Sequence, residues 1–172
     1  MSEPNSTKGT LFQKTLNVKS IKYRDCKPEE LVISDCLKKI NDEIKGDSKT
    51  VLIGSSLGGL LAAKTAISNP NVTHLILLNP AIIPPDFDIN KITDMPYRIL
   101  KEMKDEKLYS EKIGSKIFII AGTMDDVVPS NWVIKFAQKQ EATVKFLHDD
   151  HSLTQNIDRL PKIIKDLLGE KD

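Results

Sequence analysis

Four short apolar segments constrain the fold of this sequence more than any other feature. They are TVLIG, HLILLN, KIFIIAG and TVKFL, at residues 50–54, 74–79, 116–122 and 143–147. Each has the length of a β-strand, and segments with helical spacing separate them. Strands that are apolar on both faces and alternate with helices form a parallel sheet that helices cover on both sides.

Helical spacing of apolar residues predicts the elements between these strands. Helices are expected after Pro28, from Leu57 and from Ser130, and a final amphipathic helix is expected over residues 153–168. A further short strand is expected at residues 17–23, NVKSIKY. The predicted fold class is therefore α/β, a doubly wound, mostly parallel sheet of about five strands flanked by helices.

The length and charge of the chain fit one domain that does not bind nucleic acid. With 172 residues the chain can bury a single hydrophobic core, so residues 1–172 are expected to form one domain. Its 25 basic and 24 acidic residues give a formal net charge of only +1. Domains that bind nucleic acid usually carry a strong basic excess, so no such partner is expected.

The sequence carries no targeting or membrane signal, which favours a cytoplasmic protein. No apolar run approaches the roughly 20 residues that span a bilayer. The start MSEPNSTKG is too polar for a signal peptide. Cys26 and Cys36 have neither a CxxC nor a His-paired spacing and are expected to be free thiols.

Residues 82–110 break the regular alternation of strands and helices. Three prolines interrupt this stretch, and a helix is expected to begin near Asp94. The segment is long enough to form a small lid or one wall of a pocket, or it packs in the core as a plain connection. Its apolar side chains are candidates for substrate binding: Ile82, Phe87, Met95 and Tyr97.

The motif Gly54-Ser55-Ser56-Leu57-Gly58 lies between a predicted strand and a predicted helix. A serine on such a tight turn is lifted above the sheet edge, and flanking glycines let the neighbouring chain pass. The Leu57 N–H then lies at a helix N-terminus, where it can stabilise an oxyanion. The alternative is a small-residue turn that serves only close packing. The context favours Ser56 as a nucleophile.

A serine nucleophile needs a histidine base and an acid, and the chain supplies both in the order Ser, Asp, His. Asp125 and Asp126 follow the strand at 116–122, and either can be the acid. His148 and His151 follow the strand at 143–147, and either can be the base. Because parallel strands end at one edge, these residues are expected to meet Ser56 there.

Neither a metal nor an organic cofactor is expected. The run from His148 to His151 lacks a third spaced ligand group, and His74 opens a strand far from the predicted site. GxGxxG and GxxxxGK[ST] motifs are absent, so nothing supports nucleotide binding.

These motifs resemble the α/β-hydrolase superfamily, and within it the small YqiA-like esterases. GSSLGG at 54–59 resembles the nucleophile elbow of the family, and Leu78-Asn79-Pro80-Ala81 resembles its Asn-Pro-Ala turn. Residues 124–127 resemble the acid loop, which favours Asp125, and residues 149–152 resemble the histidine loop, which favours His151. The resemblance implies hydrolysis of a carboxylic ester or thioester through an acyl-serine. Asn79 joins the candidate substrate-binding residues.

The start of the chain departs from that family. Family members open with an apolar strand and a His-Gly turn, just before the stretch that Ser2–Leu16 resembles. The missing strand would lie between those expected at 17–23 and 50–54, and its turn would supply a second oxyanion N–H. Either the true start lies upstream or the sheet closes differently. Ser2–Lys8 would then lie nearest to the oxyanion, and an exposed edge would favour a homodimer.

The leading hypothesis is a serine esterase or thioesterase that acts on a small molecule. Ser56 attacks the acyl carbon, His151 transfers the proton, Asp125 orients His151, and the Leu57 N–H stabilises the oxyanion. The alternative is a catalytically weak or inactive protein of the same fold that binds a ligand or partner.

Overall fold

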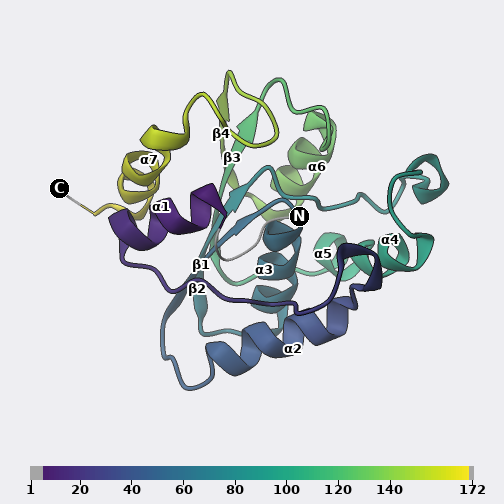
Figure 1. The fold of residues 1–172 in the computed structure, drawn as a ribbon, viewed down its shortest axis with the longest axis horizontal. Helices are drawn as coiled ribbons and strands as arrows, with labels where there is room; N and C mark the ends of the chain where they lie inside the picture. Colours follow the sequence, from purple (N-terminus) through teal and green to yellow (C-terminus); the bar gives the residue numbers. More distant parts are fainter. Residues whose placement is uncertain (1–5, 171–172) are drawn as a thin grey trace.

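A parallel four-stranded sheet forms the centre of the molecule (Figure 1). The computed structural model describes residues 6–170. The strands are β1 (Thr50–Ser55), β2 (Val72–Leu78), β3 (Lys116–Gly122) and β4 (Thr143–Leu147), and they lie in that order across the sheet. Every neighbouring pair is parallel, so all four carboxyl ends lie at one edge. The α/β class predicted from the sequence is confirmed.

Helices cover both faces of this sheet. The α-helices within residues 6–170 are α1 (Thr7–Leu16), α2 (Ile33–Glu43), α3 (Leu57–Ser68), α4 (Tyr97–Met103), α5 (Lys107–Ser110), α6 (Ser130–Gln140) and α7 (Leu160–Leu168). Short 3-10 turns lie at Pro28–Glu30, Ile89–Lys91 and Ile157–Arg159. None of the helices in the described part of the chain is long and apolar enough to cross a bilayer.

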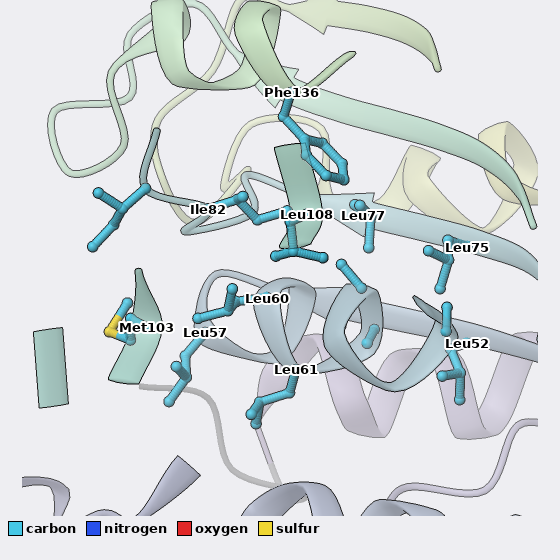
Figure 2. Packing of buried hydrophobic residues seen from close by; sticks show 14 of the residues in the cluster. Leu52, Leu57, Leu60, Leu61, Leu75, Leu77, Ile82, Met103, Leu108 and Phe136 are labelled. Carbon is cyan, nitrogen blue, oxygen red and sulfur yellow. The ribbon is translucent and has the colours of Figure 1, made fainter. Parts of the chain in front are cut away.

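Side chains that alternate along β2 divide the core into two clusters. Leu75 and Leu77 belong to a large cluster with α2 to α6, and Figure 2 shows part of it. Ile76 and Leu78 point the other way and pack with α1 and α7, which lie side by side in Figure 1. All four side chains are fully buried, and burial of each contributes roughly 1.5–3 kcal/mol.

Residues 17–23 do not form the strand that their pattern predicts, so that prediction is wrong. They pair with no strand in the described structure, and β1 is left as an edge strand. The two segments line a common cavity of about 340 Å³. Val18 packs on the α1–α7 side, whereas Ile21 and Tyr23 pack on the large cluster. Side-chain packing therefore holds this segment without a hydrogen-bond ladder.

The final helix begins later than the sequence pattern predicts. Helix α7 starts at Leu160 and not at residue 153. The backbone at Leu153 has a positive φ of 55°, which no α-helix accommodates. In addition, the Asp149 carboxylate accepts hydrogen bonds from the backbone N–H groups of Gln155 and Asn156. These contacts hold residues 149–156 as a loop.

Residues 82–110 pack extensively into the core. The segment contributes α4, α5 and several buried side chains, among them Ile82, Ile83, Ile99, Leu100, Met103 and Leu108. Helix α4 contacts α2, and α5 contacts α3 and α6. Helix α4 begins at Tyr97 after Pro96, close to the expected start near Asp94. Much of this stretch therefore acts as a packed connection between β2 and β3.

Candidate active site

Ser56 occupies a strained turn between β1 and α3. Its backbone has φ 54° and ψ −120°, a region that costs a non-glycine residue about 1–3 kcal/mol and that clusters at functional sites. Four main-chain hydrogen bonds hold the turn. The Ser56 N–H donates to Leu78 O at 2.9 Å. Ser56 O accepts from Gly59 N at 2.9 Å, Ala81 N at 3.1 Å and Leu60 N at 3.3 Å. The nucleophile candidate is thus fixed from β2 as well as from its own helix.

The two glycines of the motif serve different purposes. A Cβ atom on Gly54 would lie 2.3 Å from the carbonyl oxygen of Gly58, whereas a Cβ on Gly58 would meet nothing within 4 Å. Gly59 is also restricted, because a Cβ there would lie 2.9 Å from Cβ of Pro80. Gly54 and Gly59 therefore allow the close approach of strand and helix, and Gly58 does not contribute to it.

Alanine substitutions are expected to separate these roles. Gly54→Ala forces a clash between backbone groups and should lower the free energy of unfolding by about 2–4 kcal/mol. The matched variant Gly58→Ala should be neutral or stabilising by up to ~1 kcal/mol, because alanine favours helix. Urea unfolding followed by circular dichroism measures both. Equal destabilisation of the two variants would contradict the close-approach argument.

Ser56, His151 and Asp125 form one continuous set of hydrogen bonds. Ser56 Oγ lies 3.0 Å from His151 Nε2, and His151 Nδ1 lies 3.0 and 2.9 Å from the two carboxylate oxygens of Asp125. The three residues follow the ends of β1, β4 and β3. The Asp125 side chain is only 2% exposed, and that of His151 is 21% exposed. Solvent or substrate can therefore reach the base while the acid stays buried.

Asp125 is held as a carboxylate by its surroundings. Burial on its own raises the pKa of this group. The hydrogen bond with His151 and those from the backbone N–H groups of Val128 and Val127, at 2.8 and 2.9 Å, outweigh it and leave the pKa below its usual value. Asp126 and His148 are both exposed. The geometry therefore favours Asp125 and His151 over the alternatives that the sequence left open.

Asn79 joins the ends of three strands. This residue is 1% exposed and follows β2 with a positive φ of 43°. Its Nδ2 donates to the carbonyl oxygens of Asp150 and His151 at 3.2 and 2.8 Å, and its Oδ1 accepts from Gly122 N at 2.8 Å. Its amide is thus engaged in holding the histidine loop against β3. We propose that Asn79 positions the base, in place of the substrate-binding role expected from the sequence.

We propose Asp149 as a further positioning residue, one that the sequence pattern did not indicate. Its side chain is fully buried and accepts from the backbone N–H groups of Asp150, Gln155 and Asn156 and from Asn156 Nδ2, all at 2.8–3.1 Å. Burial raises the pKa of Asp149, but these hydrogen bonds outweigh burial and hold the pKa below its usual value. The available signal was an acidic residue two positions before the histidine.

Asp149→Asn is expected to destabilise the fold in a pH-dependent way. At pH 7 the free energy of unfolding should fall by about 2–4 kcal/mol, because an amide nitrogen replaces a charged acceptor and leaves donors unpaired. A lowered folded-state pKa means that the carboxylate stabilises fully above its unfolded pKa, and that this contribution is lost as pH falls through the folded pKa. The difference in the free energy of unfolding between Asp149→Asn and wild type should therefore become smaller at low pH. Urea titrations at pH 7 and pH 3 measure it, with exposed Asp158→Asn as the control that should change little at either pH.

Groups that could stabilise an oxyanion come from α3 and α1. Leu57 is the first residue of α3, so its N–H has no acceptor within the helix. At the start of α1, Lys8 Nζ donates to Ser152 O at 3.1 Å, beside the base. Burial lowers the pKa of Lys8, and the charges of Asp150, Asp149 and Asp125 oppose this effect. Of the expected segment Ser2–Lys8, residues 2–5 lie outside the described structure.

The remaining candidate substrate-binding residues are spread over different environments. Ile82 is buried in the core, and Phe87 packs edge-on against Trp132 with ring centroids 4.8 Å apart. Met95 packs partly against the large cluster, whereas Tyr97 is 56% exposed. Their contribution to a substrate pocket stays a prediction. Within residues 6–170, no group of three His, Cys, Asp or Glu side chains is arranged to hold a metal ion.

A sequence model of the family described as "Uncharacterised protein family (UPF0227)" matches residues 1–168. The chain belongs to the UPF0227 family. This is the YqiA-like family that the sequence motifs resemble, so that prediction is confirmed. No curated protein sequence matches the UPF0227 chain.

Several solved structures share the fold of the UPF0227 chain. Alpha/beta hydrolase domain-containing protein 10 from mouse has a TM-score of 0.75 at 20% identity, over 98% of this chain and 86% of that one. A monoacylglycerol lipase from Paleococcus ferrophilus has a TM-score of 0.78 at 15% identity, over 98% and 90%. Est1E from Butyrivibrio proteoclasticus has a TM-score of 0.73 at 18% identity, over 98% and 83%. The UPF0227 chain therefore has an α/β-hydrolase fold.

Proposed function

We propose that this UPF0227 chain is a serine hydrolase that cleaves small carboxylic esters or thioesters through an acyl-serine intermediate. The observation that carries the proposal is the unbroken set of hydrogen bonds from Asp125 through His151 to Ser56 on a strained turn. A buried acid, an imidazole and a serine in this order form the machinery of acyl transfer. The name of one structural neighbour, a monoacylglycerol lipase, agrees with an ester substrate.

Each group has a defined step in this mechanism. Ser56 Oγ attacks the acyl carbon while His151 Nε2 accepts its proton, and Asp125 stabilises the imidazolium through Nδ1. The carbonyl oxygen becomes an oxyanion that accepts from the Leu57 N–H at the start of α3. His151 then returns the proton to the alcohol or thiol that leaves. In the second half, water attacks the acyl-serine with His151 again as base.

Covalent labelling with a fluorophosphonate probe tests the proposal directly. The probe phosphonylates a serine only where a base activates it, and peptide mass spectrometry identifies the modified residue. Modification of Ser56 alone, with neighbouring Ser55 unmodified, is the expected result. Absence of labelling in a sample that circular dichroism shows to be folded would overturn the catalytic proposal. It would favour a binding protein, for which the supporting observation is the edge of β1 that pairs with no strand of residues 6–170.

If Ser56 is labelled, kinetic measurements on two types of substrate then determine which leaving group the chain prefers. Short aryl esters and acyl-CoA thioesters can use the same triad but differ in the size and charge of the leaving group. A higher kcat/KM for aryl and alkyl esters would make the chain an esterase, and a higher value for acyl-CoA would make it a thioesterase.

A further inference from the structure

Lys8 lies on the packed face of α1, a position that a lysine rarely occupies. Lys8, Phe12 and Leu16 follow one another at intervals of four residues and therefore share one side of the helix. Phe12 is 5% exposed, and Leu16 packs against the same hydrophobic cluster, which contains Ile76 and Leu78 of β2. The side of α1 that carries Lys8 is thus the side that packs on the sheet.

Two contacts fix the first turn of α1. Ser6 caps the helix, and its Oγ accepts a hydrogen bond from Gly9 N at 3.1 Å. Lys8 Nζ donates to the carbonyl oxygen of Ser152 at 3.1 Å. Ser152 directly follows His151 in the chain. The first turn of α1 therefore contacts the loop that carries the base, across 144 positions of sequence.

Three consecutive carbonyl oxygens of the histidine loop accept hydrogen bonds from side chains of other elements. Asn79, which follows β2, donates from Nδ2 to the carbonyl oxygens of Asp150 and His151. Lys8 donates to the next carbonyl oxygen, that of Ser152. The backbone on both sides of the His151 side chain is therefore held by groups from outside the loop, and Lys8 provides the contact on the C-terminal side.

The charge of Lys8 interacts with both loops that carry the acid and the base. Lys8 is half-buried, and burial lowers the pKa of its ammonium group, whereas the carboxylates of Asp150, Asp149 and Asp125 oppose this effect. Asp149 and Asp150 belong to the histidine loop, and Asp125 is the proposed acid. Partial loss of hydration makes this position costly for a cation, and costly placements of charge are frequent at functional sites.

We propose that Lys8 is a positioning residue of the active site. Its ammonium group holds the carbonyl oxygen of Ser152 and thereby keeps His151 Nε2 directed at Ser56 Oγ, 3.0 Å away. A displacement of about 1 Å at a reacting group costs on the order of 10²-fold in rate, so a contact one residue from the base controls the reaction. This role rests on the proposed function, because it concerns the base of that reaction.

Substitutions at Lys8 test the proposal in the whole chain. Lys8→Met keeps an apolar stem but removes the donor, and it should lower kcat for p-nitrophenyl acetate about 10–100-fold with little change in KM. Lys8→Arg retains a charged donor and should stay within about threefold of the wild-type kcat. Lys14→Met makes the first change on an exposed side chain of the same helix and should leave kcat unchanged. Equal kcat values for wild type and Lys8→Met would overturn the proposal, as would equal losses in Lys8→Met and Lys8→Arg.

The rate of fluorophosphonate labelling separates this role from the proposed function. The probe reacts with the same base-activated hydroxyl, so the second-order rate constant for Ser56 should be about 10–100-fold lower in Lys8→Met than in wild type. Absence of labelling in wild type would overturn the hydrolase and with it the catalytic role of Lys8. Equal labelling of wild type and Lys8→Met would leave the hydrolase standing and overturn the role of Lys8 alone.

Hydrogen exchange distinguishes positioning of the loop from direct stabilisation of the oxyanion, and it requires no activity. The N–H groups of Leu153 and Thr154 donate to the carbonyl oxygen and to Oδ1 of Asp150, both at 3.1 Å. Both amides should exchange about tenfold faster in Lys8→Met, because the loop loses an external contact, whereas the amides of β3 should keep their protection. Unchanged exchange of both amides together with slower labelling of Ser56 would overturn the positioning role and assign Lys8 to the oxyanion.

Discussion

Ser56→Ala is expected to lower kcat for an aryl ester by a factor on the order of 10⁴–10⁶, because the variant has no nucleophile and retains only binding and oxyanion stabilisation. The backbone of the turn should persist, since the four hydrogen bonds that hold it involve main-chain atoms. Initial rates on p-nitrophenyl acetate, corrected for spontaneous hydrolysis, measure the effect. Thermal unfolding should show a change of no more than a few degrees.

The neighbouring serine provides the control for this prediction. Ser55 ends β1, one residue before Ser56, and it is the Ser56 hydroxyl that lies within hydrogen-bond distance of His151 Nε2. Ser55→Ala should keep kcat within a fewfold of wild type. A loss of equal size in both variants would show that the substitutions act through the turn and not through the nucleophile.

Asp125→Asn is expected to lower kcat by a factor on the order of 10⁴. The amide NH₂ would donate to His151 Nδ1, so that the ring carries its proton on Nε2, facing Ser56. In this tautomer Nε2 cannot accept the serine proton. KM should change little, because Asp125 is buried behind His151 and does not face the substrate.

Asp126→Asn is the matched control, since it makes the same chemical change one residue away on an exposed side chain. Its kcat should equal that of wild type. Comparable losses in the two variants, measured on the same ester, would contradict the assignment of Asp125 as the acid.

Local patterns predicted the sheet closely because its strands are buried on both faces. The segments expected at 116–122 and 143–147 coincide with β3 and β4, and those at 50–54 and 74–79 differ from β1 and β2 by at most two residues at an end. Residues 17–23 carry a strand-like pattern as well. A pattern cannot reveal whether a neighbouring strand is available, and here the segment and β1 line a common cavity without pairing.

The sequence was sufficient to predict the order Ser, Asp, His of the site residues. It was not sufficient to predict the buried contacts that hold them in place. Parallel strands gather their carboxyl ends, so Ser56, Asp125 and His151 could be expected at one edge, and the structure brings them within hydrogen-bonding distance. The contacts of Asn79 with carbonyl oxygens of the histidine loop depend on how two distant backbones pack. No spacing in the sequence encodes them. For the same reason, the hydrogen bonds that the buried Asp149 carboxylate accepts from residues 150–156 were not predicted.

The amide of Asn79 has a consequence for dynamics. It connects the end of β2 with Gly122 on β3 and with the loop that carries His151, so these three segments can separate only by breaking several buried hydrogen bonds together. Loops held in this way open rarely compared with frayed or exposed ones. Ser56, His151 and Asp125 are therefore held in place before any ligand arrives, and if the chain is the proposed hydrolase, closure of the histidine loop should not gate turnover.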